Sequence, residues 1–173
     1  MRRLFLATAL ILCGLTGFSQ IYDPVKWTTE VERISETEYD LITTASIESG
    51  WHLYAQNVPQ DGPIPTTITY VKAKEYELVG TTSEEEGRTL DDPVFGMEIK
   101  FFELSATFKQ RIRVLDTNPF SIVGEVEFMV CDDMQCLPPE MVDLNFVIPE
   151  STGAVMAPSI KEKSSNRNLF SIF

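Results

Sequence analysis

The pattern that most restricts the fold of this 173-residue chain is a two-residue alternation of apolar and polar side chains. It is clearest in residues 122–131, where Val126, Phe128 and Val130 share one face. Such alternation is typical of a strand with one buried face, and no window shows the longer period of an amphipathic helix. Because each strand must cover its apolar face with another sheet, the sequence predicts an all-β fold, either an antiparallel two-sheet sandwich or an open barrel.

Further strands are expected in several β-branched or alternating stretches between Pro- and Gly-rich turns. These stretches are residues 26–34, 39–47, 51–56, 66–71, 76–79 and 141–148. Residues 102–114 are predicted to form one long strand, with Leu104, Ala106, Phe108 and Ile112 as core positions. The acidic stretch 81–93 (TTSEEEGRTLDDP) is expected to be an exposed loop.

Residues 1–19 have the features of a secretory signal peptide. Arg2 and Arg3 precede an apolar run, which ends at a small-x-small tripeptide, residues 17–19. A lipid anchor on Cys13 is disfavoured, because Leu12 stands where a small residue is expected. We therefore expect export to a periplasm-like space and cleavage after Ser19 or Gln20.

The rest of the chain is long enough for one domain, which we place at residues 20–149. Loss of the two arginines of the signal peptide changes the formal charge from −12 to −14. This acidity argues against nucleic acid as a partner and against direct contact with an anionic membrane. Residues 150–173 read as a flexible tail, whose apolar end at 169–173 fits either the start of a membrane segment or a tail that ends on hydrophobic residues.

Without Cys13 the exported chain keeps two cysteines, Cys131 and Cys136, which flank four residues of a predicted hairpin loop. Directly opposite residues of an antiparallel pair lie about 4.5 Å apart, which permits a disulfide. Spacing alone leaves its role open between redox activity and structural bridging, because a loop of about six residues gives only about 2 kcal/mol of stabilisation.

Other chemistries have little support in the sequence. Zinc needs four ligands, and the chain has a single histidine, His52, which we interpret as an ordinary strand residue. There is no phosphate-binding glycine loop and no Ser/His/Asp arrangement. We therefore predict neither a metal nor a cofactor.

Three motifs resemble the N-terminal periplasmic domain of the DsbD family of thiol:disulfide interchange proteins. The first is VCDDMQCLPPE at 130–140, the second GWHLY at 50–54, and the third DDPVFG at 91–96. They occur in the family's order, and together they cover residues 26–148. Two departures stand out: the family pattern has one more residue between the cysteines, and Pro93 and Val94 stand where an acid and an aromatic are expected.

The resemblance implies an immunoglobulin-like β-sandwich that relays reducing equivalents in the periplasm. Its partners would be thioredoxin-like proteins or domains and a membrane electron-transfer domain. Cys136 would form the mixed disulfide and Cys131 would resolve it. A cap over the cysteines would contain Asp91, Asp92, Val94 and Phe95, with Phe95 as the lid, and Trp51 and Tyr54 would line the site.

Several acids lie near the cysteine pair in the sequence, among them Asp132, Asp133 and Glu140. Negative charge disfavours a thiolate, so we expect the isolated pair to react slowly until a partner displaces the cap. The competing hypothesis is an exported β-sandwich binding module whose disulfide is purely structural.

Overall fold

The computed structural model describes residues 22–150, and every regular element in this range is a β-strand. The expected signal peptide and most of the expected tail, residues 1–21 and 151–173, lie outside the described residues.

Eleven strands follow one another within residues 22–150. They are β1 (Val25–Arg33), β2 (Glu38–Ile47), β3 (His52–Tyr54), β4 (Thr67–Tyr70), β5 (Tyr76–Glu84), β6 (Arg88–Asp92), β7 (Met97–Glu103), β8 (Ser105–Val114), β9 (Phe120–Phe128), β10 (Val130–Cys131) and β11 (Glu140–Ile148).

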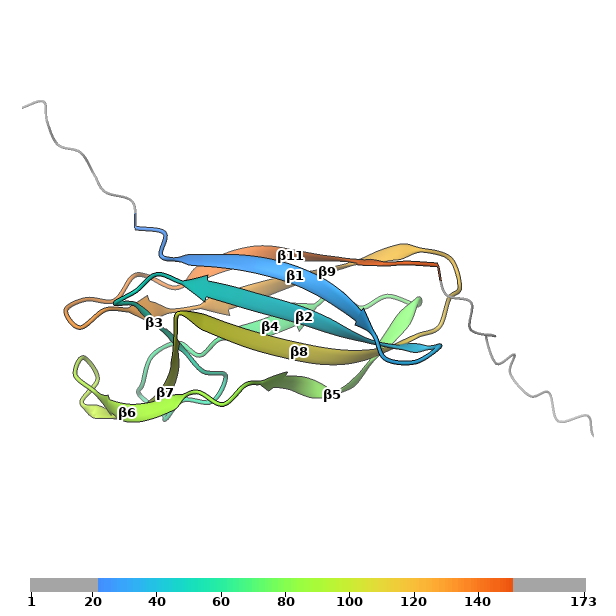
Figure 1. Ribbon diagram of the computed structural model, residues 1–173. Coiled ribbons are helices and arrows are strands. Elements are labelled where there is room, and N and C mark those ends of the chain that lie inside the picture. Colours follow the sequence, from blue (N-terminus) through green and yellow to red (C-terminus); the bar gives the residue numbers. More distant parts are fainter. Residues whose placement is uncertain (1–21, 151–173) are drawn as a thin grey trace, which may run out of the picture.

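The strands form three antiparallel sheets, arranged as an elongated immunoglobulin-like sandwich (Figure 1). One layer has the order β1-β2-β8-β5 and the other β11-β9-β4. Along one side, β1 lies beside β11, and the Thr29 hydroxyl donates to the Asn145 carbonyl at 2.8 Å. The predicted all-β, antiparallel sandwich is confirmed.

The main core lies between the two layers and follows from the alternation in the sequence. In β8, Ala106, Phe108, Gln110 and Ile112 are buried on the inner face, while the single residues between them point outward. Leu144 and Phe146 of β11 meet them from the other layer. These inward positions are the ones that a period of two selects.

A third sheet, β10-β3-β7-β6, lies at one end of the sandwich and separates two clusters of buried side chains. Successive residues of a strand point to opposite faces, so this sheet contributes to both clusters. Its inner face adds Leu53, Phe102 and Val130 to the main core. Its outer face holds a second, smaller cluster formed by Tyr54, Ile99, Phe101 and Cys131.

The prediction of a single long strand over residues 102–114 is wrong. The chain turns at Leu104, whose φ of 66° lies in the left-handed region, and β7 and β8 belong to different sheets. Leu104 is therefore a corner residue with 64% of its surface exposed, and the core position expected for it is also wrong.

The expectation of an exposed loop at residues 81–93 is wrong as well. Its first part extends β5 to Glu84, and its last part forms β6, which pairs with β7 along its whole length. Strand β6 is an edge strand, and of its five residues only Asp92 is buried. A strand so exposed shows the polar composition of a loop.

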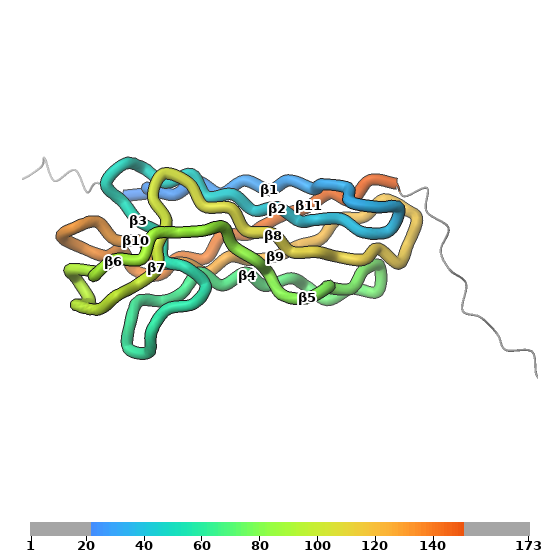
Figure 2. The backbone as a smooth tube through the Cα atoms, turned by 60° about the horizontal axis from the view of Figure 1, so that its bottom comes forward, coloured from blue at the N-terminus to red at the C-terminus, as the bar shows by residue number. Residues whose placement is uncertain are grey.

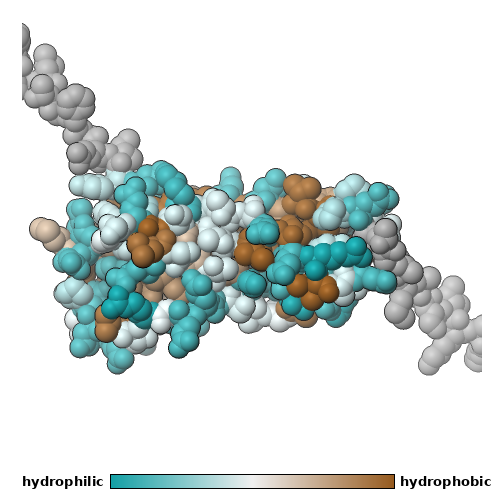
Figure 3. Space-filling view, viewed as in Figure 1, coloured by the Kyte–Doolittle hydropathy of each residue, from teal (hydrophilic) through white to brown (hydrophobic). Residues whose placement is uncertain are grey.

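Two hairpins project at the same end of the sandwich in both backbone views (Figures 1 and 2). One is the loop between β6 and β7, and the other follows β10. The face seen in Figure 3 is largely hydrophilic and carries several separate hydrophobic patches. No helix long and apolar enough to cross a membrane occurs within residues 22–150.

Candidate functional site

The cysteine hairpin, residues 131–136, forms where strand β10 ends. Cys131 and Cys136 are antiparallel bridge partners with their Cα atoms 4.0 Å apart, and a disulfide joins them. Asp132 shapes the turn, because its Oδ1 accepts hydrogen bonds from the backbone N–H groups of Met134 (2.8 Å) and Gln135 (2.7 Å). These two bonds hold the pKa of Asp132 below its ordinary value.

The two half-cystines differ in exposure. Cys131 belongs to the outer cluster and is fully buried, whereas Cys136 is partly exposed. Met134, at the tip of the hairpin, is almost entirely exposed. A partner that approaches this end of the sandwich therefore meets Cys136 before Cys131.

Strand β3 lies directly beside Cys131 and positions two polar side chains on the outer face of its sheet. His52 is the cross-strand partner of Cys131, and Leu53 is the partner of Val130. Since the side chains of His52 and Tyr54 are two residues apart, they point to the same face. The ring of Tyr54 packs in the outer cluster beside Cys131.

The cap hairpin, residues 92–97, covers the same cluster. It connects β6 and β7, at the edge of the sheet opposite to β10. Asp92 organises it: its Oδ1 accepts from the backbone N–H groups of Val94 (2.8 Å) and Phe95 (3.0 Å). Its carbonyl accepts from the N–H of Gly96 at 2.7 Å, where a φ of 64° favours glycine. One buried aspartate thus fixes the conformation of the whole loop.

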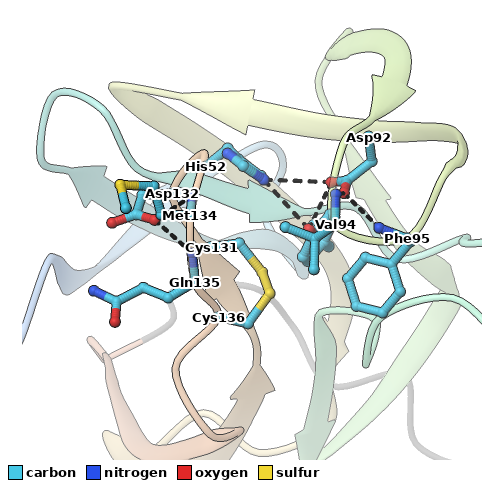
Figure 4. Close-up of a disulfide and its surroundings, with 10 residues drawn as sticks. His52, Asp92, Val94, Phe95, Cys131, Asp132, Met134, Gln135 and Cys136 are labelled. Atoms are coloured by element: carbon cyan, nitrogen blue, oxygen red, sulfur yellow. Dashed lines mark hydrogen bonds and ion pairs between the residues drawn. A yellow bond between two sulfur atoms is a disulfide. The ribbon is translucent and has the colours of Figure 1, made fainter.

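Two residues of the cap hairpin, Phe95 and Met97, pack against the outer cluster that contains Cys131. The ring of Phe95 meets that of Tyr54 edge to face, with centroids 5.8 Å apart. Val94 is 44% exposed. Figure 4 shows Val94 and Phe95 on the loop beside the disulfide.

A buried network of hydrogen bonds connects the cap hairpin to strand β3. The phenol of Tyr54 donates to Asp92 Oδ2 at 2.7 Å, and His52 Nε2 lies 3.4 Å from the same oxygen and 3.3 Å from the phenol oxygen. Burial favours a raised pKa for Asp92, but the bonds from Tyr54, Phe95 and Val94 and the proximity of His52 outweigh it and lower the pKa. Burial and the neighbouring carboxylate raise the pKa of Tyr54 far above its ordinary range, so this phenol stays protonated.

Comparison with known families identifies the relatives of this chain. Residues 24–147 match the family described as the N-terminal part of the thiol:disulfide interchange protein DsbD. The chain belongs to this family. The match covers both hairpins and all eleven strands of the described region except the last residue of β11.

Several solved structures are similar to this chain in fold. The N-terminal periplasmic domain of ScsB from Proteus mirabilis is 13% identical with a TM-score of 0.53, and the alignment covers 79% of this chain and 53% of that one. The N-terminal domain of DsbD from Neisseria meningitidis, in its reduced form, is 17% identical with a TM-score of 0.46, covering 72% and 86%. The GAE domain of GGA2p from Saccharomyces cerevisiae is 10% identical with a TM-score of 0.41, covering 76% and 96%. No curated protein matches the chain in a sequence comparison.

Most of the site residues expected from the DsbD resemblance lie together. Tyr54 and Phe95 pack in the cluster that contains Cys131 and Cys136, and Asp92 is hydrogen-bonded to Tyr54. Asp91 is exposed and lines a cleft beside this group, with a volume of about 190 Å³. Trp51 points to the opposite face of the sheet and is buried in the main core. Its ring centroid lies 5.6 Å from that of Tyr22, which is exposed.

Sequence reasoning assigned no role to His52, yet the structure places this residue at the centre of the network. Its position two residues before Tyr54 was the available signal, because the pair shares a face. The arrangement places a partly exposed cysteine, Cys136, beside the cap hairpin, where its disulfide can undergo exchange. Among residues 22–150, no three His, Cys, Asp or Glu side chains are grouped to hold a metal ion.

Proposed function

We propose that this domain carries out thiol:disulfide exchange through Cys131 and Cys136, relaying reducing equivalents from a thioredoxin-like donor to oxidised exported proteins. The observation that carries the proposal is the unequal exposure of the two bonded cysteines beside the cap hairpin. A disulfide that only stabilised the fold would gain nothing from one partly exposed cysteine and a cap built around a buried aspartate.

The chemistry uses the two cysteines in sequence. In the reduced domain, the thiolate of Cys136 attacks a disulfide of the acceptor, and the sulfur displaced from the acceptor takes up a proton. The thiolate of Cys131 then attacks Cys136 in the mixed disulfide, which reforms the internal disulfide and releases the second acceptor thiol. Two electrons and two protons thereby pass to the acceptor.

The cap hairpin gives this reaction its selectivity. Phe95 packs on the cluster that contains Cys131, and the carboxylates of Asp92 and Asp132 lie nearby. Negative charge disfavours the thiolate, so the cysteine pair reacts slowly with small disulfides while the cap hairpin is in place. Docking of a partner displaces Phe95 and exposes Cys136.

Family membership supports a thiol:disulfide exchange domain, and the ScsB domain is periplasmic by its description. We accordingly place this domain in the periplasm, delivered there by residues 1–19 as a cleaved signal peptide. Its donor in the proposed relay is a thioredoxin-like domain supplied by a membrane electron-transfer domain.

A trapping experiment tests the assignment. The probe is a thioredoxin-like protein with one active-site cysteine, activated as a mixed disulfide with thionitrobenzoate. The C131A variant is expected to form a stable mixed disulfide with this probe through Cys136. The matched C136A variant should react far more slowly, because its remaining thiol is fully buried.

The competing function, a binding module with a structural disulfide, predicts a different outcome. If neither variant forms the adduct, or if both form it at the same rate, the proposed roles of the two cysteines are wrong. The double variant C131A/C136A sets the background.

A further inference from the structure

Hydrogen bonds hold the cysteine hairpin in shape on both sides of its disulfide. On the strand side, the backbone N–H of Leu137 donates to the carbonyl of Val130 at 3.0 Å. On the loop side, the N–H of Asp132 donates to the carbonyl of Gln135 at 2.9 Å. The two cysteines are bridge partners between these two bonds, so the backbone itself brings their side chains together.

The side chain of Asp132 closes the turn. Its Oδ1 accepts from the backbone N–H groups of Met134 and Gln135, two and three residues further along the chain (Figure 4). Aspartate and asparagine favour turns of this kind because their side-chain oxygen takes the place of a backbone acceptor. Asp133 is exposed, and in the described part of the chain no hydrogen bond of this turn uses its side chain. The shape of the loop therefore depends on one of two adjacent aspartates.

The four hydrogen bonds of the hairpin do not involve sulfur, so they remain available when the disulfide is reduced. The Cα atoms of Cys131 and Cys136 are 4.0 Å apart in the oxidised protein. A hairpin that stays folded after reduction keeps the two thiols at a similar separation. Such thiols meet far more often than thiols at the ends of a flexible loop, because the entropy of loop closure is already lost.

We propose that Asp132 is a positioning residue for the proposed exchange: its turn keeps the reduced hairpin folded and so holds Cys131 within reach of Cys136. This role rests on the proposed function of the cysteine pair. It concerns the second step, in which the thiolate of Cys131 attacks Cys136 in the mixed disulfide. That attack forms the internal disulfide and breaks the bond to the acceptor sulfur, which leaves as a thiolate and takes up a proton.

The direction of the effect follows from which states contain the turn. Removing the Asp132 acceptor weakens the oxidised form and the closed reduced form equally, and it leaves an open reduced hairpin unaffected. The reduced state is therefore stabilised relative to the disulfide. Loss of a side-chain acceptor for backbone N–H groups changes such an equilibrium by about fivefold.

Equilibration with glutathione measures this change. Two glutathione thiols reduce the internal disulfide to two thiols and become one glutathione disulfide, so buffers of known composition give the equilibrium constant. D132A is expected to shift this constant about fivefold toward the dithiol, which raises the reduction potential by about 20 mV. Relative to the internal disulfide, quenched samples of D132A should also contain about fivefold more mixed disulfide between glutathione and the domain, because only ring closure is disfavoured.

Two variants separate the turn from the charge of Asp132. D132N keeps a side-chain oxygen that accepts the same hydrogen bonds, so its equilibrium constant should match that of the wild type. D133A removes one negative charge from the same loop, as D132A does, and it should also match the wild type. A role for Asp132 in fold stability alone would lower the urea midpoint of D132A without changing the reduction potential.

Hydrogen exchange in the reduced protein shows whether the hairpin stays folded. The amides of Met134 and Gln135 should remain protected in the reduced wild type and in reduced D132N, and they should lose protection in reduced D132A. The amide of Val71, which donates to Val123 outside the site, should keep its protection in every variant and so reports that the domain is folded.

An unchanged equilibrium constant for D132A overturns the inference, as does a constant for D132N that falls as far as that of D132A. Either result leaves the proposed function intact if C131A still traps the thioredoxin-like probe through Cys136. If D132A shifts the constant as expected but C131A does not trap the probe, the proposed function fails, and the role of Asp132 in exchange fails with it.

Discussion

The phenol of Tyr54 donates a 2.7 Å hydrogen bond to the carboxylate of Asp92 and thereby joins strand β3 to the cap hairpin. Both groups are buried, so breaking this bond leaves a charged acceptor without its donor until water enters. The cap therefore opens as a unit, and Tyr54 and Asp92 set the free energy of opening.

Replacing Tyr54 by Phe removes that bond and keeps the ring. We expect the free energy of unfolding of the oxidised protein to fall by about 1.5 to 3 kcal/mol, and reduction by dithiothreitol to become about tenfold faster. Urea denaturation and the kinetics of reduction measure the two effects. The control Y76F removes a hydroxyl that bonds to Val71 away from the site, and it should lower stability without faster reduction.

Acid should loosen the cap through Asp92. Its pKa is lower in the folded protein than in the unfolded chain, so its contribution to stability is present above the ordinary value of 3.8 and is lost as the pH falls through the folded value. Urea denaturation between about pH 5 and pH 2 should show a steeper loss of stability for the wild type than for D92N.

Asp116 provides a control for that experiment. Hydrogen bonds from Asn118 lower the pKa of Asp116, but this residue lies outside the site. D116N should also flatten the acid dependence of stability, while its rate of disulfide reduction should match the wild type. Equal slopes for D92N and the wild type would contradict the assignment of Asp92.

The disulfide should contribute little to the fold. It closes a loop of about six residues, for which the loss of chain entropy predicts about 2 kcal/mol. The C131A/C136A variant is therefore expected to fold and to lose about that amount of unfolding free energy. A variant that fails to fold, or that loses twice as much, would favour a structural disulfide.

The corner between β7 and β8 stores strain at Leu104. This residue adopts a φ of 66° and is largely exposed, so its side chain gains little from packing. Because glycine adopts this conformation without steric cost, L104G should raise the unfolding free energy by about 1 kcal/mol. L78G is the matched control: it removes an exposed leucine of β5 and should not stabilise.

The sequence predicted the strands in which one face is buried and the other is exposed to solvent. Alternation in β9 and β11 is the direct consequence of that environment, and the inward residues Val126, Phe128, Leu144 and Phe146 are buried. The corner at Leu104 escaped detection because the alternation continues through it without Gly or Pro. The same side-chain pattern serves β7 and β8, although they belong to different sheets.

The site was predictable only as far as the motifs extend. The spacing of Cys131 and Cys136 predicted a hairpin that allows a disulfide, and the structure has one. The sequence could not distinguish Asp91 from Asp92, because register alone decides which of two adjacent acids points inward. The same limitation applied to His52, because its acidic partner, Asp92, is some 40 residues away in sequence.

The reduction potential of the Cys131–Cys136 pair tests the central claim most directly. It is measured by equilibrating the oxidised domain in glutathione buffers and counting the thiols that become alkylated. A role in exchange predicts a midpoint between about −180 and −270 mV, the range of exchange-active proteins. A midpoint below about −300 mV would mark a structural disulfide and contradict the account.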